Sequence, residues 1–523
     1  MEQTLCIRNG RIYGLQGLQE ADTLLIERGV IRYAGNVSGL QNRLLQNMEV
    51  IDAGGRIIFP GFADTHMHLS DWARRQDYLE LGTFRSLKSL LAYLGEQAEN
   101  REWLIGGGWN QNAWEERRFP HRRDLKGLPQ GCKVIFYSKD LHSAWVNDAV
   151  IDLFDFNDVV RMLQKGFVRR DAEGHLDGLL HEEALEVLLD PILRRNPIPI
   201  FENPQHYFTS FYRYGITTLH SMEHLEQYRR YLELYQHEGG RGPRLGIYVY
   251  GTEAAAVFAS GMRSAAGGEY FRFQGLKYFV DGALGSQTAW LREPYENAIQ
   301  YGKRQLHGDA LFRVLAAAEG QRQGLSIHAL GDAAVEDLLK VLDRFGRPLR
   351  VPLRIEHAQL LDEGLIEALR NHQIPVSVNP SHLIDDKAIA ELHWGKRSRW
   401  AYPFRSLKMA GVPFAFGSDA PVEDINPWKG VYAAVHRIGA GDSEAWYPEE
   451  CIRLSDAIDA CSRNTAALGG ISARKGILAP GYPGDCFICN RDVFDQGVED
   501  WQDIHSLLTV IDGRIVYRSA ELG

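Results

Sequence analysis

The chain has 523 residues, of which 45% are hydrophobic and 24% are charged. These ordinary proportions exclude a disordered, collagen-like or disulfide-scaffold protein. Lys and Arg number 58 against 68 Asp and Glu, which gives a formal net charge of -10, and no long run of one sign suggests a nucleic-acid partner. One hydrophobic core rarely serves so long a chain, so we expect a large catalytic barrel with appended segments, or two to three domains.

The start of the sequence, MEQTLCIRNGRIYG, lacks the basic and apolar regions of a secretion signal, and no window has the apolar length that spans a bilayer. We therefore expect no membrane partner and a cytoplasmic location. The six cysteines are scattered, as is usual for reduced thiols: Cys6, Cys132, Cys451, Cys461, Cys486 and Cys489. Only the last two form a CxxC pair, and their apolar run CFIC favours a strand over a metal or redox site.

Both ends of the chain predict short strands joined by tight turns. The runs TLCIRNGRIYG, DTLLIERGVIRYAG and MEVIDAGGRIIFP are rich in β-branched or alternating residues and are broken by Asn-Gly, Arg-Gly and Gly-Gly. GDCFICN and LLTVIDGRIVYR repeat this style near the other end, where DGRI echoes the early NGRI. We expect residues 1–55 and 473–523 to share one small β-sandwich.

Eight strand-like runs predict a barrel. The first is RIIFPGFADTHMHL at 56–69, and the others lie at 215–221, 244–251, 275–282, 324–331, 353–360, 374–380 and 412–419. Helix-like segments such as 309–323 and 332–345 separate the later runs. Parallel strands that alternate with crossover helices are typical of the (β/α)8 barrel, an α/β TIM barrel, which we assign to residues 56–70 and 215–472.

A long segment separates the first predicted barrel strand from the second. It is too long for one crossover, and it contains a strand-like run, CKVIFYS, and a helix-like run, HEEALEVLL. We therefore predict an inserted domain at residues 71–214.

Residues that can bind metal gather at the carboxyl ends of the predicted barrel strands. His66 and His68 are two apart, so their rings project from one face of the first strand, although an isolated HxH is more often a pair of polar turn residues. His328 ends the fifth strand, His357 lies in the sixth, and Asp419 directly follows the eighth. Catalytic groups of barrels gather at this end. Imidazoles with a carboxylate suit zinc or a similar ion better than calcium or magnesium.

Lys277 lies within the apolar run LKYFV, where an inward-facing ammonium group is costly to desolvate unless it is paired or modified. Carboxylation by carbon dioxide would make it an anionic carbamate that can bridge two metals; otherwise the residue is a neutral or salt-bridged lysine. Asp281 follows Lys277 by an even number of positions, so both side chains should face inward from the strand. Asp281 then either orients substrate or a ligand, or caps the following loop. His220 ends the second strand, but nothing in the pattern requires it to bind metal, and we leave it out.

Seven motifs together resemble the amidohydrolase superfamily, specifically the amidohydrolase family 3 or YtcJ-like branch related to N-substituted formamide deformylases. They are PGFADTHMH, LKYFVDGALGS, SIHALGD, RIEHAQ, GSDAP, RNTAALG and KGILAPGYPGD. The resemblance implies two divalent metal ions, taken as zinc, with N6-carboxylysine at Lys277 bridging them. The implied ligands are His66, His68 and Asp419 for one ion, His328 and His357 for the other, and Lys277 for both.

The predicted insertion also resembles that branch, in GGGWNQNAW and in DLHSAWVN. Relatives commonly have an Asp-Gly-His stretch here, and Leu141 replaces its glycine. Trp109, Asp140 and His142 are therefore candidate substrate residues together with Asp281. Taken singly, a tryptophan more often packs in a core, and a histidine more often forms a capping hydrogen bond.

These features predict a metal-dependent amidohydrolase that cleaves a C-N bond of a small-molecule amide, cyclic amide or N-formyl compound with a metal-activated hydroxide. Asp419 is the expected catalytic residue, because it can accept a proton from the nucleophile and deliver it to the leaving nitrogen. A mononuclear metal-dependent deaminase, without the lysine carbamate, is a second hypothesis. A non-catalytic small-molecule-binding protein is a third, which the complete set of ligands disfavours. A homo-oligomer stays open.

Overall fold

The computed structural model describes residues 4–19, 21–39, 48–76, 78–99, 101–129, 131–138, 143–181, 184–193, 198–237, 242–296, 298–439, 441–495 and 501–522. The chain divides into two compact units, residues 1–72 with 203–523, and residues 73–202. The second unit ends earlier than the predicted insertion, because α6 (Pro204–Tyr212) contacts β15 (Ile216–Glu223) of the first unit.

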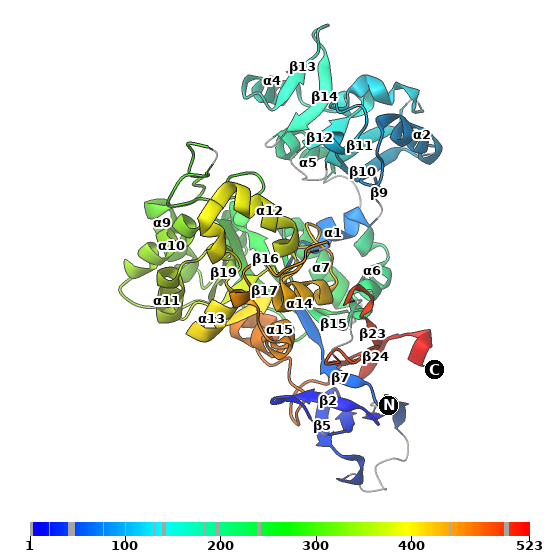
Figure 1. Cartoon of the computed structure of the whole chain (residues 1–523), viewed down its shortest axis with the longest axis vertical. Coiled ribbons are helices and arrows are strands. Elements are labelled where there is room, and N and C mark those ends of the chain that lie inside the picture. Colours follow the sequence, from blue (N-terminus) through cyan, green and yellow to red (C-terminus); the bar gives the residue numbers. More distant parts are fainter. Residues whose placement is uncertain are drawn as a thin grey trace. The chain divides into compact units, whose positions relative to one another are not determined.

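Eight parallel strands form the centre of the first unit (Figure 1). Hydrogen bonds join them in chain order, so that neighbours in the sequence are neighbours in the sheet. Their bounds are β8 Phe62–Met67, β15 Ile216–Glu223, β16 Arg244–Tyr250, β17 Phe271–Phe279, β18 Leu325–Ala329, β19 Leu353–His357, β20 Val376–Val378 and β21 Phe414–Phe416. The Thr65 hydroxyl donates to the Phe416 carbonyl at 2.9 Å, which brings the first strand beside the last. The predicted α/β fold of TIM-barrel type is therefore confirmed.

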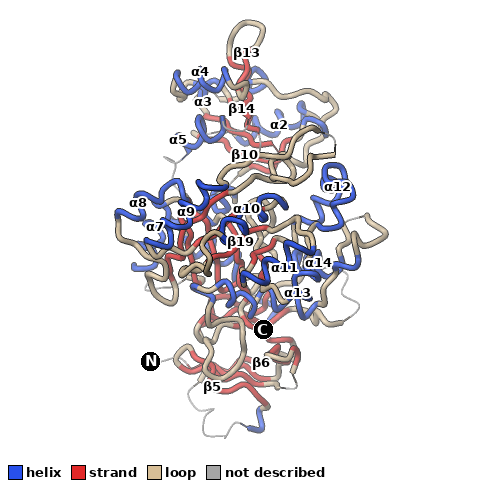
Figure 2. Tube along the Cα trace, turned by 90° about the vertical axis from the view of Figure 1, so that its left-hand side faces the viewer, coloured by secondary structure: helices blue, strands red, loops and turns tan. Residues whose placement is uncertain are grey.

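Helices surround these strands on their outer side, as two views show (Figures 1 and 2). They are α7 Leu225–His237, α8 Ala254–Ala259, α9 Gly308–Gly320, α10 Asp332–Asp343, α11 Glu363–His372, α12 His382–Trp394, α13 Phe404–Ala410, α14 Pro427–His436 and α15 Leu454–Cys461. In α10, Val335, Leu338 and Leu342 recur at helical spacing and are buried, which explains why this segment packs as a helix. The helix-like segments predicted at 309–323 and 332–345 are α9 and α10. No helix of the described ranges is long and apolar enough to cross a membrane.

The run 56–69, predicted as one strand, forms two strands in different sheets. β7 (Ile57–Pro60) pairs with strands near both ends of the chain, whereas β8 begins the barrel. Gly61 lies between them, donates its N–H to the Asp485 carbonyl at 2.9 Å, and lies so close to the Thr217 hydroxyl that a side chain would clash. The apolar pattern continues through this glycine, so periodicity did not reveal the change of sheet.

Strands from both ends of the chain form two further sheets in the first unit. The six-stranded sheet has the order β24-β23-β22-β7-β2-β3, and the four-stranded sheet has the order β5-β4-β1-β6. Their bounds are β1 Thr4–Arg8, β2 Arg11–Gly14, β3 Gly17–Leu18, β4 Thr23–Glu27, β5 Val30–Gly35, β6 Glu49–Asp52, β22 Cys486–Cys489, β23 Ser506–Ile511 and β24 Arg514–Arg518. Leu5 and Ile26 of one sheet pack in a cluster with Ile488 and Val510 of the other.

The second unit contains one mixed sheet of order β13-β14-β12-β11-β10-β9. Its strands are β9 Leu79–Glu80, β10 Trp103–Trp109, β11 Lys133–Ser138, β12 Ser143–Val146, β13 Val168–Arg170 and β14 Leu176–His181. The helices α2 Leu87–Gln97, α3 Asp148–Ile151, α4 Phe156–Gln164 and α5 Asp190–Leu193 accompany it, while α1 (Leu69–Arg75) follows the first barrel strand. The strand predicted from CKVIFYS is β11. The helix-like run 181–189 is helical from Leu185 and leads into α5.

Candidate metal centre

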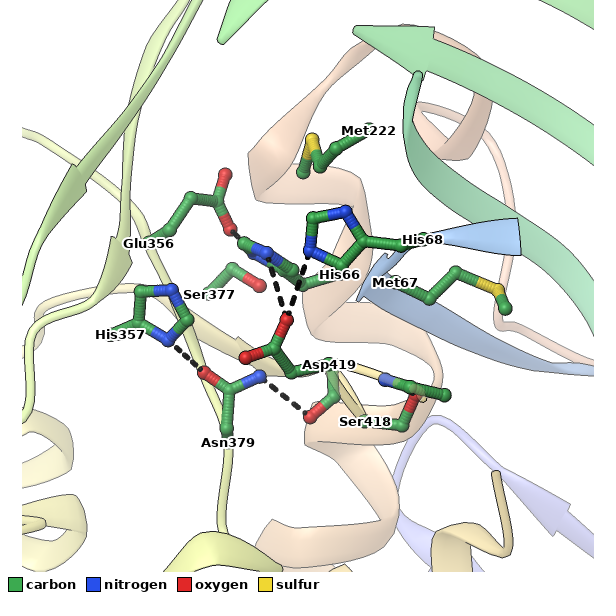
Figure 3. A network of polar contacts seen from close by, with 12 residues as sticks. His66, Met67, His68, Met222, Glu356, His357, Ser377, Asn379, Ser418 and Asp419 are labelled. Atoms are coloured by element: carbon green, nitrogen blue, oxygen red, sulfur yellow. Dashed lines mark hydrogen bonds and ion pairs between the residues drawn. The ribbon is translucent and has the colours of Figure 1, made fainter. Parts of the chain in front are cut away.

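Three side chains from three strand ends lie close enough together to hold one metal ion. His66 in β8, His357 at the end of β19 and Asp419 after β21 each offer a ligand atom, and these atoms lie within 4.8 Å of one another. His68 joins them through Asp419, because the Nε2 atoms of His66 and His68 are each 3.3 Å from Oδ1 of Asp419 (Figure 3). Four of the six predicted ligands therefore converge at the carboxyl end of the barrel strands.

Glu356 fixes the state of the His66 ring. Burial would raise the pKa of Glu356, but Arg354 and His66 hold it well below its usual range, so this group is a carboxylate and can only accept hydrogen bonds. His66 Nδ1 therefore donates to Glu356 Oε2, at 2.6 Å, and the lone pair of its Nε2 faces Asp419. Burial lowers the pKa of His66 to about 4, so the ring is neutral near pH 7, as a metal ligand must be.

Asn379 does the same for His357. The Asn379 amide group donates to the Gly417 carbonyl at 3.0 Å, which turns its oxygen toward His357 Nδ1 at 2.8 Å. The proton of the His357 ring therefore lies on Nδ1, and Nε2 keeps its lone pair. Burial brings the pKa of His357 well below its usual value, so this ring is also neutral.

His68 and His328 complete the set of imidazoles. His68 Nδ1 lies 2.8 Å from the hydroxyl of Tyr250, while its Nε2 faces Asp419. The His328 ring lies 4.4 Å from the His357 ring, and His328 Nε2 donates to the Gly282 carbonyl at 3.0 Å, which leaves the Nδ1 lone pair free. Burial lowers the pKa of His328 to about 3.

Asp419 is a carboxylate in a strained position. Burial alone would raise its pKa, but the neighbouring His66, His68 and His357 hold it well below the usual range. Burial also lowers the pKa of His68, yet the hydrogen bond and charge of Asp419 outweigh that effect and raise it. Asp419 has a φ of 59°, in the left-handed region that a side chain disfavours, and its N–H donates to the His66 carbonyl at 2.6 Å. The backbone thus accepts strain where the carboxylate is placed.

Lys277 is buried, with 1% of its surface exposed. Its Nζ lies 5.1 Å from the centre of the Phe279 ring and has no hydrogen-bond partner among the described residues. Burial lowers the pKa of Lys277 to about 8. A buried ammonium without a partner is costly, so the position fits an amine that is modified or that meets a metal.

His220 is fully buried, and both of its ring nitrogens have partners. Arg354 Nη1 donates to His220 Nδ1 at 2.7 Å, and His220 Nε2 donates to the Ser472 hydroxyl at 2.8 Å. No lone pair is left for a metal, in agreement with its exclusion from the predicted ligands. Arg354 also donates to Glu356 Oε1 at 2.5 Å, and Glu356 in turn accepts from His66. One buried hydrogen-bond network therefore connects His220 with the His66 ring.

The four candidate substrate residues have different positions. Asp281 has no exposed surface, and its carboxylate accepts hydrogen bonds from the backbone N–H groups of Trp290, Leu330 and Gly331. Asp281 therefore caps the following loop, which disfavours substrate contact by this residue. Trp109 is buried in the core of the second unit and donates to the Phe136 carbonyl at 2.7 Å. Its substrate role stays a prediction, and Asp140 and His142 lie outside the described residues.

Sequence reasoning missed Glu356, Asn379 and Tyr250, which fix the rings of the ligands. Arg354 and Glu356 are two charged residues at alternate positions of the otherwise apolar strand LRIEH, which is a signal for inward-facing charge. Tyr250 ends β16 and Asn379 follows β20. A search for polar residues at the carboxyl ends of all barrel strands, as was made for the histidines, would have marked both residues.

Residues 49–517 match the model of the amidohydrolase family. YtcJ of Bacillus subtilis, a protein named as an amidohydrolase, is 29% identical over 98% of this chain and 99% of its own. The N-substituted formamide deformylase of Arthrobacter pascens is 23% identical over 95% of each chain. The crystal structure of an uncharacterized metal-dependent hydrolase from Pyrococcus furiosus superposes with a TM-score of 0.78 and 26% identity, over 94% of this chain and 99% of that one.

This breadth of similarity identifies a metal-dependent amidohydrolase. The chain belongs to the amidohydrolase family, and the resemblance noted in its motifs is confirmed.

Proposed function

We propose that this protein hydrolyses the C-N bond of a small amide, cyclic amide or N-formyl compound with two divalent metal ions, by preference zinc. The ions would be held by His66, His68, Lys277, His328, His357 and Asp419. The observation that carries the proposal is the arrangement of hydrogen bonds on the rings of His66, His328 and His357. In each, one nitrogen is occupied by a protein acceptor, which leaves a lone pair on the other.

The donor set fits such ions. Neutral imidazoles and one carboxylate are ligands of zinc-like metals, and Lys277 Nζ is a buried polar atom that lacks a protein partner among the described residues. Bound ions would supply a water of lowered pKa and a polarised substrate carbonyl. The formamide deformylase of Arthrobacter pascens supports the N-formyl member of this substrate class.

Asp419 would move the proton in this reaction. As the water oxygen bonds to the carbonyl carbon, a proton passes from that water to the Asp419 carboxylate. The C-N bond then breaks, and the proton passes from Asp419 to the leaving nitrogen, so that the products are a carboxylic acid and an amine. Oδ2 of Asp419 is suited to this task, because Oδ1 faces His66 and His68.

Lys277 would serve as a carbamate. Its uncharged nitrogen would form a bond to the carbon of carbon dioxide while one C=O π bond opens onto oxygen, and the displaced N–H proton would pass to water, which leaves an anionic group with two oxygens. A pKa of about 8 leaves part of the amine uncharged near neutral pH, and this favours the modification.

The same evidence supports three further proposals. Apolar residues shared between the two terminal sheets support a β-sandwich built from residues 1–55 and 473–523, to which β7 adds residues 57–60. The other proposed segments are a barrel of residues 56–70 and 215–472 and an insertion of 71–214, of which residues 73–202 form a compact unit. All six cysteines are unpaired in the structure, which supports a cytoplasmic location. The partner would be a small molecule rather than nucleic acid or a membrane.

One experiment tests the reaction. The metal-loaded protein is assayed against a panel of N-substituted formamides, N-acyl amines and cyclic amides, and released amine is measured before and after treatment with a chelator. We expect hydrolysis of at least one class, its loss on chelation, and its return when zinc is added. Asp419→Asn should lower kcat by about a thousandfold or more with little change in far-ultraviolet circular dichroism. Activity that survives complete metal removal would contradict the proposal.

The mononuclear deaminase stays a second candidate, because His66, His357 and Asp419 alone suit one ion. Amino-substituted heterocycles are therefore included in the panel, with ammonia as the product measured. Ammonia release with one ion per chain, and no cleavage of amides, would favour the deaminase.

A further inference from the structure

His382 places a buried ring nitrogen beside Asp419. It begins α12 directly after the seventh barrel strand, and its N–H donates to the Asn379 carbonyl at 3.2 Å, which turns the chain at the end of that strand. Its ring lies 6.5 Å from the His357 ring. Its Nε2 is buried and has no hydrogen-bond partner among the residues that the structure describes.

The two oxygens of Asp419 face different neighbours. Oδ1 is 3.3 Å from Nε2 of both His66 and His68, whereas Oδ2 is 3.7 Å from Nε2 of His382. His382 thus lies on the side of Asp419 that the metal-binding histidines leave open, and this is the side assigned to proton transfer.

The contact with Asp419 does not satisfy the His382 ring. At 3.7 Å, Nε2 of His382 and Oδ2 of Asp419 are too far apart for a hydrogen bond. A buried Nε2 without a partner can take a group from outside the protein. With the ring proton on Nδ1, Nε2 is an acceptor for a donor on a bound molecule.

A buried acceptor without a donor lowers stability, so a fold that keeps one beside its reactive carboxylate needs an explanation. An N–H on the scissile nitrogen of the substrate would provide that donor. With this N–H directed at His382 Nε2, the lone pair that develops on the nitrogen as the C-N bond breaks can turn toward Oδ2 of Asp419. The same contact would thus orient the nitrogen for the proton that Asp419 delivers.

We propose that His382 accepts a hydrogen bond from the scissile N–H of the substrate, and that the protein therefore selects amides with a hydrogen on that nitrogen over their N-alkylated counterparts. This inference rests on the proposed function and names the part of the substrate class that the site takes. A site built around such a hydrogen bond rejects analogues that lack the donor.

The test compares matched pairs of amides that differ only in an N-methyl group on the scissile nitrogen. Four zinc-loaded proteins are used: wild type, His382→Ala, His382→Gln and the control Lys387→Ala. Lys387 is on the same helix, and its ion pair with Asp442 at 3.1 Å involves no residue of the metal centre. Glutamine keeps an acceptor oxygen at a similar reach, so it separates the hydrogen bond from the shape of the ring. Metal content is measured for each protein by elemental analysis.

We expect wild type and Lys387→Ala to have a kcat/KM about tenfold or more higher for the N–H amide than for its N-methyl partner. His382→Ala should lower kcat/KM for the N–H amide about tenfold or more and leave the N-methyl amide within about threefold, so that the preference disappears. His382→Gln should recover part of it. Metal content should be the same in all four proteins.

A preference that is unchanged in His382→Ala would overturn the inference, and so would loss of metal from that variant, since His382 would then hold the metal centre rather than substrate. If wild type cleaves no member of the panel, the proposed function fails, and calorimetric titration with the same amide pairs decides the inference by itself. Tighter binding of the N–H member that is lost in His382→Ala supports it, and equal binding of both members overturns it.

Discussion

Glu356 and His66 come from two different barrel strands and meet inside the barrel, with 2.6 Å between Oε2 and Nδ1. Neither side chain has more than 1% of its surface exposed. The other oxygen of the carboxylate, Oε1, accepts from Arg354 at 2.5 Å and from the Ser326 hydroxyl at 2.6 Å. The Glu356 carboxylate therefore holds one ring nitrogen of His66 and directs the other toward Asp419.

Glu356→Gln should weaken zinc binding by about 10- to 100-fold, because the ring of His66 loses the carboxylate that orients it and strengthens its Nε2. Competition with a chelator of known affinity measures the change. The control is Glu363→Gln, which removes a charge from the exposed first turn of α11 and should leave zinc affinity unchanged. Equal zinc affinity in wild type and Glu356→Gln would contradict the role given to this pair.

Lys277→Ala should lower kcat by about a hundredfold or more, because the carbamate that we propose at this residue cannot form. Added acetate or propionate should restore part of the activity, since a small carboxylate fits the space left by the side chain and offers two oxygens. The control Lys340→Ala removes a lysine that pairs with Glu336 at the surface of α10, and acetate should not change its rate. Full activity of Lys277→Ala without acetate would rule out the bridge.

Reassembly of the metal-free protein with zinc should depend on pH through Lys277. The amine reacts with carbon dioxide only when it is uncharged, and its pKa is about 8. Below that value the reactive fraction falls about tenfold per pH unit, and above it the fraction levels off. At a constant pressure of carbon dioxide, the rate of recovery of activity should rise from about pH 6.5 to 8 and then flatten. A rate that does not change over this interval would show that carboxylation of Lys277 is not part of assembly.

The barrel could be predicted because each parallel strand is a short apolar run bounded by polar turns, and runs such as RLGIYVYG match the strand they form closely. The predicted single strand at 56–69 failed because hydrophobic periodicity records burial and not the sheet to which a strand belongs. Gly61 marks the change only through its close approach to Thr217, a residue far away in the sequence.

The candidate ligands other than Lys277 could be singled out because each stands near or just beyond a strand end, a position that the pattern alone locates. The pattern marks Asn379 after a strand end and Glu356 by its charge, but it does not show which ligand each of them orients, since Glu356 acts on a residue 290 positions earlier and Asn379 acts on the neighbouring strand. His382 escaped notice because it opens a helix instead of ending a strand. Only the three-dimensional structure brings it to Oδ2 of Asp419.

Arg244→Met should lower the free energy of unfolding of the chain by about 3–5 kcal/mol, because it leaves the buried Asp485 carboxylate without its main partner. Arg244 donates to both oxygens of Asp485, at 2.7 and 2.9 Å, and is fully buried. Chemical denaturation followed by circular dichroism measures the difference. Arg8→Ala is the control, because the Arg8 and Asp52 side chains are 4.0 Å apart and about half exposed, so its loss should change stability little. Equal effects of the two substitutions would contradict this account of the buried pair.

The metal-to-protein ratio, measured by elemental analysis after purification without chelators, tests the proposed two-metal centre most directly. We expect about two divalent ions per chain in the wild-type protein, and a ratio lower by about one in His66→Ala and in His328→Ala, each of which removes a proposed ligand of a different ion. The same samples, assayed on the best amide of the panel, should lose activity together with the ion. A wild-type ratio below one, or an alanine variant with unchanged metal content and unchanged activity, would contradict it.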